Sequence, residues 1–295
     1  MPTTSSICVV AERSPLTWKP FDGFAVRKSA NTVYVHDFEG FETRNLSTFR
    51  LLLAAIDMLC VEDFPWILVN TGDRDAPTSI KGIPSLSYST TCGTHDHVCP
   101  DFVFDHWRQT QLDDYDLGAK ELTTLGMTRP VTDQLGWRGA LTHPVRQVLA
   151  GLDDKRDFDT ELIVWDRSNP GRLTCSNFVS LADQVRRWRY LIDIEGTGYS
   201  GRLKLLFFSR RVVFLQQRPF EEWYFPDLKP WMHYVPVRRD LADLIEQLHR
   251  LKQQPDLEQM ITDRALEFAS LRLTRGAAIA RWGELLSSHA RGTLT

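Results

Sequence analysis

Two carboxylates separated by one residue, Asp73 and Asp75, follow an apolar run in the stretch "ILVNTGDRDAP" (67–77). Paired carboxylates at the end of a buried strand can hold a divalent cation against the diphosphate of a nucleotide sugar. A single carboxylate at such a position can instead act as a general base that removes a proton from a hydroxyl group. The second carboxylate is then a turn residue. The stretch alone leaves a metal site and a general base as alternatives.

A glycine-containing loop connects a predicted strand to a predicted helix in the stretch "DIEGTGYSGRLKLLFFS" (193–209). Its three glycines have the spacing Gly-x-Gly-x-x-Gly and are Gly196, Gly198 and Gly201. Glycine lets the backbone approach an anion, the N–H groups at the start of a helix attract negative charge, and Arg202 and Lys204 add positive charge. The loop is therefore a candidate phosphate site, although no acidic residue about twenty positions further on is an obvious ribose partner. A plain strand-to-helix turn is the alternative.

A second basic set occurs in "WRGALTHPVRQVL" (137–149), where Arg138 and Arg146 stand on either side of a turn that contains Pro144. Two guanidinium groups near a cleft suit bidentate recognition of a phosphate or a carboxylate. Without further context, two solvated arginines at the start of a helix are the favoured explanation of the pattern.

The chain shows no convincing metal site. His95, Asp96 and His97 are neighbours, and neighbouring positions on a strand point to opposite faces, so these side chains would not converge on one ion. The five cysteines are odd in number and contain no Cys-x-x-Cys pair, so neither a disulfide framework nor a zinc site is predicted.

Alternating strands and helices are predicted around these residues. In the first part of the chain the pattern predicts a strand over 31–38, a helix over 45–60 with Asn45 and Ser47 as capping candidates, and strands over 65–73 and 82–91. This β-α-β order predicts a parallel sheet with crossover helices. Ligands bind at the carboxyl ends of such strands, which is where Asp73 lies.

The second part of the chain repeats the alternation after a polar stretch over 108–134. Its predicted elements are strands over 160–166, 190–196 and 211–217, helices over 181–190 and 202–209, and mostly helix beyond residue 240. We therefore expect an α/β protein with a Rossmann-like domain over 1–134 and a second one over 135–272. The C-terminal helix, 273–295, is expected to pack back on the first domain.

Composition and charge narrow the class of protein. The chain has 295 residues, of which 42% are hydrophobic and 25% charged, as in an ordinary globular protein. A formal net charge of −3 provides no general attraction for phosphate backbones, so nucleic acid is not an expected partner. The N-terminus has no basic region followed by an apolar core, and no apolar run reaches membrane-spanning length. We expect a cytoplasmic protein.

Several segments, in their order along the chain, resemble glycosyltransferase family 90. They are "LVNTGD", "SYSTT", "HDHVCPDFVF", "WRGALTHPVR", "YLIDIEGTGYSGRLKLLFFSRRVVF" and "WYFPDLKPWMHYVPVRRDL". The resemblance covers roughly Val33 to Leu271, and its most specific part is the run from Leu228 to Val237. That family includes protein O-glucosyltransferases of the endoplasmic reticulum, a fungal capsule-associated xylosyltransferase and bacterial lipopolysaccharide-modifying enzymes. Because the chain lacks a secretory signal, paired cysteines and a retention tail, it looks more like the bacterial branch.

The resemblance implies a GT-B fold, in which two Rossmann-like domains face a central cleft. It also implies metal-independent transfer of a sugar, with inversion, from a UDP-sugar that is held mainly by the second domain. No cofactor is expected. The family's catalytic aspartate follows a strand in an Asn-x-x-Asp setting, which falls on Asn70 and Asp73. Asp73 is then the general base and Asp75 a turn carboxylate that orients Arg74.

The resemblance also assigns a donor site. Its basic motif falls on Arg138, Gly139, Ala140, Thr142, Pro144 and Arg146, and its diphosphate loop on Thr197, Gly198, Tyr199, Ser200 and Gly201, with Arg202 as the charged partner. Ala140 departs from the motif, because the family has a serine there and a hydroxyl contact to the nucleotide is lost. Arginines and a helix N-terminus would offset the diphosphate charge, so no metal is expected.

The expected partners are the nucleotide-sugar donor and a glycan, lipid-linked or protein acceptor, with a lipopolysaccharide-type glycan in first place. A peripheral position at a membrane surface is compatible with such an acceptor. Three alternatives remain: a metal-dependent transferase that uses Asp73 and Asp75 as ligands, a nucleotide-sugar-binding protein without transfer activity, and a dehydrogenase that uses the glycine loop. The sequence names neither the sugar nor the acceptor.

Overall fold

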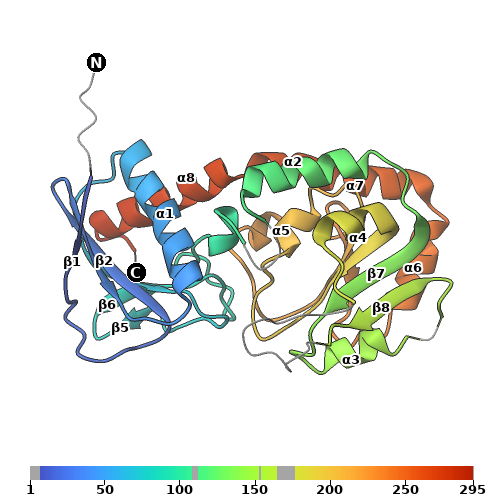
Figure 1. Ribbon diagram of the computed structural model, residues 1–295, viewed down its shortest axis with the longest axis horizontal. Helices are drawn as coiled ribbons and strands as arrows, with labels where there is room; N and C mark the ends of the chain where they lie inside the picture. The colour runs from blue at the N-terminus through green and yellow to red at the C-terminus, as the bar shows by residue number, and fades with distance from the viewer. Residues whose placement is uncertain (1–6, 108–111, 153, 165–176, 295) are drawn as a thin grey trace, which may run out of the picture. The chain divides into compact units, whose positions relative to one another are not determined.

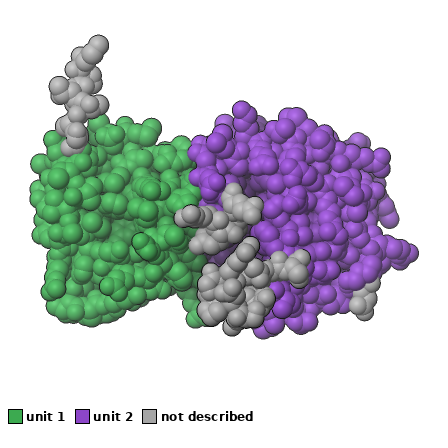
Figure 2. Space-filling model, in the orientation of Figure 1, with its two compact units in different colours: residues 1–106, 219–226, 274–295 green, residues 107–218, 227–273 purple. Residues whose placement is uncertain are grey.

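The computed structural model describes residues 7–107, 112–152, 154–164 and 177–294 of the chain. It divides into two compact units, which are coloured separately in Figure 2. Unit 1 contains residues 1–106, 219–226 and 274–295, and unit 2 contains residues 107–218 and 227–273. The first division therefore falls at residue 106, whereas the sequence suggested a boundary at 134.

Unit 1 is built on a six-stranded sheet (Figure 1). Its strands are β1 (Cys8–Ala11), β2 (Gly23–Ser29), β3 (Thr32–Asp37), β4 (Phe64–Asn70), β5 (Ser79–Ile80) and β6 (Ile83–Leu86). They are arranged in the order β1-β3-β2-β4-β6-β5. The predicted strands over 31–38, 65–73 and 82–91 are confirmed as β3, β4 and β6.

The expected purely parallel sheet is wrong for unit 1. β1 is parallel to β3 and β4 is parallel to β6, but β2 lies between β3 and β4 and is antiparallel to both. β2 and β3 form a hairpin with a two-residue loop, in which Ala30 has a φ of 51°. Two-residue hairpins need positive φ angles in the loop, and such a tight connection forces antiparallel pairing.

Two long helices and a short 3-10 helix pack in unit 1 among the residues that the structure describes. They are α1 (Glu42–Met58), the 3-10 helix η1 (Phe102–Phe104) and α8 (Arg275–Ala290), and α8 contacts both α1 and β4. α1 begins before the expected caps, so Asn45 and Ser47 are buried within the helix. The Thr274 side chain caps α8 by accepting a hydrogen bond from the Ala277 N–H group.

Unit 2 contains a five-stranded sheet in which all neighbouring strands are parallel. The strands are β7 (Thr132–Gly139), β8 (Phe158–Leu162), β9 (Trp188–Asp193), β10 (Val212–Gln216) and β11 (Val235–Val237). Their order is β11-β10-β9-β7-β8, so the chain proceeds from β7 outward to β8 and then reverses direction across the sheet at β9. The carboxyl ends of β7 and β9 therefore form the topological switch point, where open α/β sheets bind ligands.

Helices surround the unit 2 sheet, as its crossover connections require. They are α2 (Tyr115–Gly126), α3 (Val145–Ala150), α4 (Leu181–Arg187), α5 (Leu203–Leu206), α6 (Leu244–Lys252) and α7 (Pro255–Arg272). α2, α4 and α5 lie together (Figure 1). The α/β class predicted from the sequence is confirmed. Of the helices that the structure describes, none is long and apolar enough to cross a membrane.

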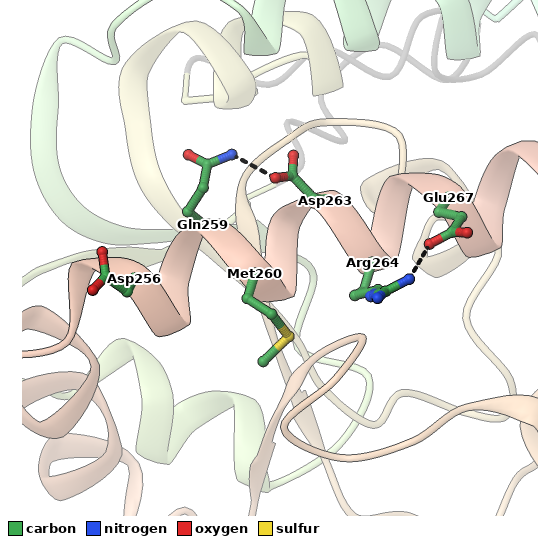
Figure 3. Close-up of a pocket in the computed structure, with 6 residues that line it drawn as sticks. All are labelled: Asp256, Gln259, Met260, Asp263, Arg264 and Glu267. Carbon is green, nitrogen blue, oxygen red and sulfur yellow. Dashed lines mark hydrogen bonds and ion pairs between the residues drawn. The ribbon is translucent and has the colours of Figure 1, made fainter.

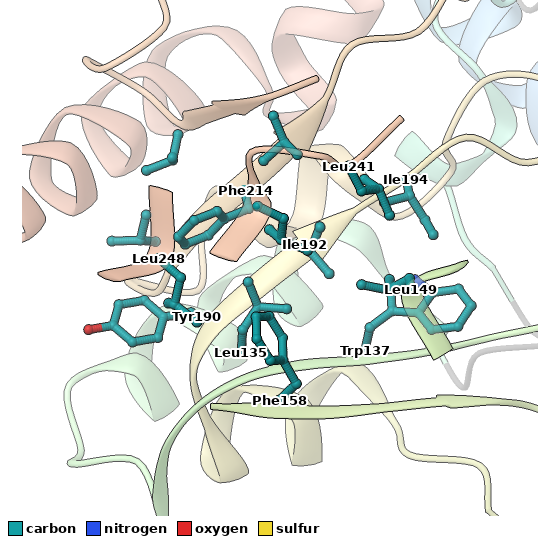
Figure 4. Close-up of a cluster of buried hydrophobic side chains, with 14 of the residues drawn as sticks. Leu135, Trp137, Leu149, Phe158, Tyr190, Ile192, Ile194, Phe214, Leu241 and Leu248 are labelled. Carbon is teal, nitrogen blue, oxygen red and sulfur yellow. The ribbon is translucent and has the colours of Figure 1, made fainter. Parts of the chain in front are cut away.

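One hydrophobic core fills a face of the unit 2 sheet (Figure 4). It combines inward-facing residues of β7 to β11 with Leu149 of α3 and Leu248 of α6, all of them almost completely buried. Leu135 and Trp137 of β7 point into this core. Because side chains alternate along a strand, Gly136 and Arg138 face the opposite side of the sheet.

Gly136 leaves space there for the indole ring of Trp188. A Cβ atom at position 136 would lie 1.7 Å from the ring atom Cδ2, far inside van der Waals contact. The indole has little freedom to move, because it is buried and its Nε1–H group donates to Asp159 Oδ2 at 2.9 Å. The same Asp159 accepts a hydrogen bond from Arg138 at 2.7 Å. A glycine in β7 therefore permits the packing that fixes Arg138.

Replacing Gly136 with alanine should lower the free energy of unfolding by about 1–3 kcal/mol, the usual cost of overpacking a buried site. Chemical denaturation measures this difference. Gly276→Ala is the control, because the nearest atom to its new methyl group would be Thr274 Oγ1 at 3.8 Å, an ordinary contact. Equal stability of the parent and Gly136→Ala would contradict the packing account.

Candidate functional site

The carboxyl ends of β7 and β9 bring several of the predicted donor-site residues together in unit 2. Gly139 is the last residue of β7, and Asp193 is the last residue of β9. The loop that follows β9 carries Thr197 to Gly201 and ends at Arg202. This edge of the sheet is the topological switch point described above.

A buried carboxylate organises this edge of the sheet. Asp193 has only 1% of its surface exposed, and its two oxygens accept hydrogen bonds from three side chains. Arg218 Nη1 donates to Oδ1 at 2.6 Å, whereas Ser200 Oγ and Arg202 Nε donate to Oδ2 at 2.8 and 3.0 Å. Burial raises the pKa of Asp193, but the charges of Arg218 and Arg202 and the hydrogen bonds outweigh burial and lower the pKa to about 2.

Arg202 joins the ends of two strands. Besides Asp193, its guanidinium group donates to the Ile192 carbonyl oxygen at 2.8 Å and to the Arg138 carbonyl oxygen at 3.2 Å. Arginine has five N–H groups, and these contacts use three of them. Arg202 therefore has both a structural role and N–H groups in reserve for an anion.

Arg146, in α3, also contacts the start of the loop after β9. It donates to the carbonyl oxygens of Glu195 at 2.8 Å and Ala140 at 2.9 Å, with a longer contact to Ile194 at 3.5 Å. Burial lowers the pKa of Arg146, and so does the positive charge of Arg202, although Asp193 opposes them; the resulting pKa is about 10. Burial is the larger cause, and the lowered pKa also reflects the nearby positive charge of Arg202.

Positive side chains gather at this edge of the sheet. The guanidinium groups of Arg146 and Arg202 lie near the Asp193 carboxylate, and both are held by carbonyl oxygens at or just after the strand ends. Positive groups fixed in a poorly hydrated place attract an anion more strongly than they would in water. The cluster is therefore suited to bind a multiply charged anion such as a diphosphate.

Arg138 is placed differently from Arg146 and Arg202. Its side chain is buried, pairs with Asp159 at 2.7 Å and lies over the Trp188 ring at 5.1 Å. Only its carbonyl oxygen contacts the cluster, through Arg202. The structure therefore gives the Arg138 side chain a packing role and does not bring it to the Asp193 cluster.

The glycine loop follows the expected strand-loop-helix order, but the expected helix over 202–209 is only the four residues of α5. Such a short helix offers little dipole for an anion. None of Gly196, Gly198 and Gly201 has a positive φ in this described loop. Gly196 is required for space instead, since a Cβ atom there would lie 2.6 Å from Arg146 Nη2.

The remaining residues of the predicted donor site show how the loop is held. Lys204 is fully buried and donates to the carbonyl oxygens of Ser200 and Gly201, so it supports the loop from within. Its ammonium group also lies 5.5 Å from the Tyr199 ring centre. Thr197 is exposed and Gly198 is buried. The ammonium group of Lys204, which was expected to attract phosphate, thus binds the carbonyl oxygens of its own loop.

Asp73 lies in unit 1, in the loop after β4. Arg44 Nη1 of α1 donates to Asp73 Oδ1 at 2.9 Å, and 38% of the Asp73 side chain is exposed. Asn70 fixes the loop by donating to the Arg74 carbonyl oxygen at 2.7 Å and accepting from the Gly72 N–H group at 2.9 Å. The candidate base is therefore held in place and still accessible.

Asp75 has a different partner from Asp73. Its Oδ2 atom accepts hydrogen bonds from the Thr91 N–H group at 3.0 Å and the Thr91 hydroxyl at 2.6 Å. It therefore fastens the loop around Thr91, whereas the sequence suggested that it orients Arg74. Within the described ranges, no three His, Cys, Asp or Glu side chains are grouped as metal ligands.

Sequence reasoning missed three charged residues of these sites: Asp193, Arg218 and Arg44. Asp193 was part of the strand-loop-helix stretch, and its position at a strand end was an available signal. Arg218 follows β10 and Arg44 lies in α1, and no local pattern distinguishes either residue from a solvated arginine. Their partners are 25 and 29 positions away in the chain.

A further pocket lies along α7 in unit 2 (Figure 3). Its lining residues are Asp256, Gln259, Met260, Asp263, Arg264 and Glu267. Gln259 donates to Asp263 and Arg264 to Glu267, so these polar groups bind one another (Figure 3). No predicted donor-site residue lines this pocket.

Comparison with known proteins agrees with the order of the motifs. The family model described as "Glycosyl transferase family 90" matches residues 27–293. Protein O-glucosyltransferase 1 of Homo sapiens is 29% identical over 241 residues, which are 74% of this chain and 60% of the human protein. The O-glucosyltransferase rumi homolog of Aedes aegypti is 34% identical over 118 residues, which cover 38% of this chain and 28% of that protein.

The chain spans about 60% of the length of the human relative, and the corresponding share is 57% for Protein O-glucosyltransferase 1 of Rattus norvegicus. The family model, by contrast, covers nearly all of the chain. The match includes Asp73, the basic motif around Arg146 and the loop that ends at Arg202. The chain belongs to glycosyl transferase family 90.

Proposed function

We propose that this protein is an inverting, metal-independent glycosyltransferase that moves a sugar from a UDP-sugar to a hydroxyl group of a glycan or protein acceptor. The observation that carries the proposal is the cluster of Arg146, Arg202 and Arg218 around Asp193 at the carboxyl ends of β7 and β9. Family membership supplies the reaction class. The proposal includes a GT-B arrangement, in which one Rossmann-like unit holds the donor and the other presents the acceptor.

On the donor side, the cluster provides fixed positive groups that can stabilise the negative charge of a departing UDP. When the bond between sugar and diphosphate breaks, negative charge increases on the leaving oxygen, and fixed positive groups stabilise it without reorganising. Arg146 and Arg202 are already fixed by carbonyl oxygens of the strand ends. Their position supports direct charge stabilisation, the task that a metal ion performs in metal-dependent enzymes.

On the acceptor side, Asp73 is proposed as the general base. Its carboxylate would take the proton of the acceptor hydroxyl as that oxygen attacks the anomeric carbon from the face opposite UDP. Its partial exposure and its fixed orientation support this role. Asp75 is engaged by Thr91 and serves the loop.

The relatives suggest which substrates to test first. Their names describe protein O-glucosyltransferases, so UDP-glucose and a protein acceptor come before the lipopolysaccharide-type glycan that the sequence suggested. The deciding experiment measures UDP release from a panel of UDP-sugars, with protein and glycan acceptors. Tight UDP binding without turnover of any donor would favour a nucleotide-sugar-binding protein.

Arg202→Ala and Arg146→Ala should each weaken UDP affinity by about 1.5–3 kcal/mol, the usual contribution of a charge-assisted hydrogen bond. Their effects should not add fully, because both would act on one diphosphate. Calorimetry gives the affinities, and thermal melts identify variants that lose the local structure. Arg156→Ala is the control, since that side chain is 90% exposed and pairs with Asp154. Unchanged affinity in both variants would place the donor elsewhere.

Asp73→Asn should bind UDP as tightly as the parent and transfer sugar about 100-fold more slowly or worse, because it lacks the base. Asp75→Asn should lose much less activity, since its amide can still accept a hydrogen bond from Thr91. Steady-state rates with saturating donor provide the comparison. Equal losses in the two variants would support a metal held by both carboxylates.

Activity should survive excess EDTA, because the arginine cluster would supply the positive charge that a cation otherwise brings. Added magnesium or manganese should change the rate by less than about threefold, a response that ionic screening can cause. A metal clamp would contribute several kcal/mol to the transition state, so its removal would lower the rate by orders of magnitude. Activity that is lost with chelator and restored by manganese would return Asp73 and Asp75 to the role of ligands.

A further inference from the structure

The first turns of α1 hold the loop that carries Asp73. Asn45 Oδ1 accepts a hydrogen bond from the Thr71 hydroxyl at 2.6 Å, and Arg44 Nη1 donates to the Thr71 carbonyl oxygen at 3.2 Å. The same Arg44 atom donates to Asp73 Oδ1 at 2.9 Å. Two consecutive residues of a helix thus fix both the backbone and the carboxylate of this loop.

Arg44 is itself restrained on a largely apolar surface. Its guanidinium carbon lies 4.0 Å from the ring centre of Phe41 and 5.2 Å from that of Phe102. Only 21% of the Arg44 side chain is exposed. Because stacking on aromatic rings reduces the freedom of a guanidinium group, Arg44 presents its N–H groups to Asp73 in a defined direction.

The contact leaves one oxygen of Asp73 available. Arg44 occupies Oδ1, and among the described residues no group donates a hydrogen bond to Oδ2. A carboxylate that acts as a base needs one accessible oxygen in a fixed direction, and a misplacement of about 1 Å can cost about 100-fold in rate. The ion pair therefore defines which oxygen receives the proton.

We propose that Arg44 is the positioning residue of the general base, and that Oδ2 of Asp73 accepts the proton of the acceptor hydroxyl. This inference rests on the proposed transferase function. In the reaction, the acceptor O–H bond breaks and its proton passes to Oδ2. The acceptor oxygen forms a bond to the anomeric carbon, and UDP leaves with the electron pair of the broken sugar–phosphate bond. Arg44 touches neither substrate and acts only through Asp73.

Arg44→Ala should lower kcat about 10- to 100-fold and leave the KM for the donor near that of the parent, because the base is displaced while donor binding is not. Arg44→Lys should be intermediate, since an ammonium group keeps the charge but not the planar geometry. Added guanidinium ion at millimolar concentration should partly restore Arg44→Ala. The assay is turnover of whichever UDP-sugar the parent uses, with water or the acceptor as nucleophile.

The double variant Arg44→Ala/Asp73→Asn separates positioning from a general structural role. If Arg44 acts only through Asp73, the double variant should be no slower than Asp73→Asn alone. Arg50→Ala is the matched control, because Arg50 lies on the same helix and its side chain is 52% exposed. Its Nη1 atom pairs loosely with Asp105 Oδ2, at 3.6 Å. Thermal melts show whether each variant is folded, and Arg44→Lys retains the test if Arg44→Ala does not fold.

The possible failures are distinguishable. If Asp73→Asn is inactive but Arg44→Ala turns over at the parental rate, the inference is wrong and the proposed function stands. If the losses of Arg44→Ala and Asp73→Asn multiply in the double variant, Arg44 acts independently of Asp73 and the inference is again wrong. If the parent turns over no UDP-sugar, or Asp73→Asn is fully active, the proposed function fails and the inference with it.

Discussion

The buried carboxylate of Asp193 is the constraint on which the unit 2 site depends. A carboxylate with 1% of its surface exposed is tolerated only when cations and hydrogen bonds replace its water. Its partners come from the loop after β9 and from the end of β10, and one of them, Arg202, also binds the end of β7. Neutralising one charge therefore fixes the ends of three strands, and it holds the guanidinium group of Arg202 at a defined place.

The arginines of this cluster differ in kind from a surface patch. Several of their N–H groups are used by carbonyl oxygens at or just after the strand ends, as the contacts of Arg146 and Arg202 show. Their effect on an anion would therefore come largely from a fixed electric field, supplemented by the remaining N–H groups. A fixed field is effective where water is scarce, because solvent screens it less there. The contacts that hold Arg146 and Arg202 in the fold therefore also fix the direction of their electric field.

The sequence predicted the strands with long apolar runs, such as β4 and β9, and the placement of Asp73 at a strand end. It did not predict β2, the strand that ends in the hairpin loop beginning at Ala30. The family resemblance assigned Arg146 and Arg202 to one predicted site, because the order of the motifs survives sequence divergence. Arg218 and Arg44 could not, because their partners lie far along the chain and a single sequence carries no record of such pairs. Lys204 and Arg138, two positive residues suggested for the phosphate site, are both buried against protein groups. A sequence does not show whether a positive group faces a ligand or the protein, because burial decides this.

Unit 1 is assembled from three separate stretches of chain, the last of which contains α8. α8 packs on α1 and β4, which are made more than two hundred residues earlier. Since a ribosome adds roughly 5–20 residues per second, the sheet of unit 1 would wait about ten seconds or longer for this helix. During that interval the apolar face of α1 and β4 lacks a covering element, which is the kind of surface that chaperones bind. The topology therefore completes unit 1 after unit 2, although unit 1 begins first.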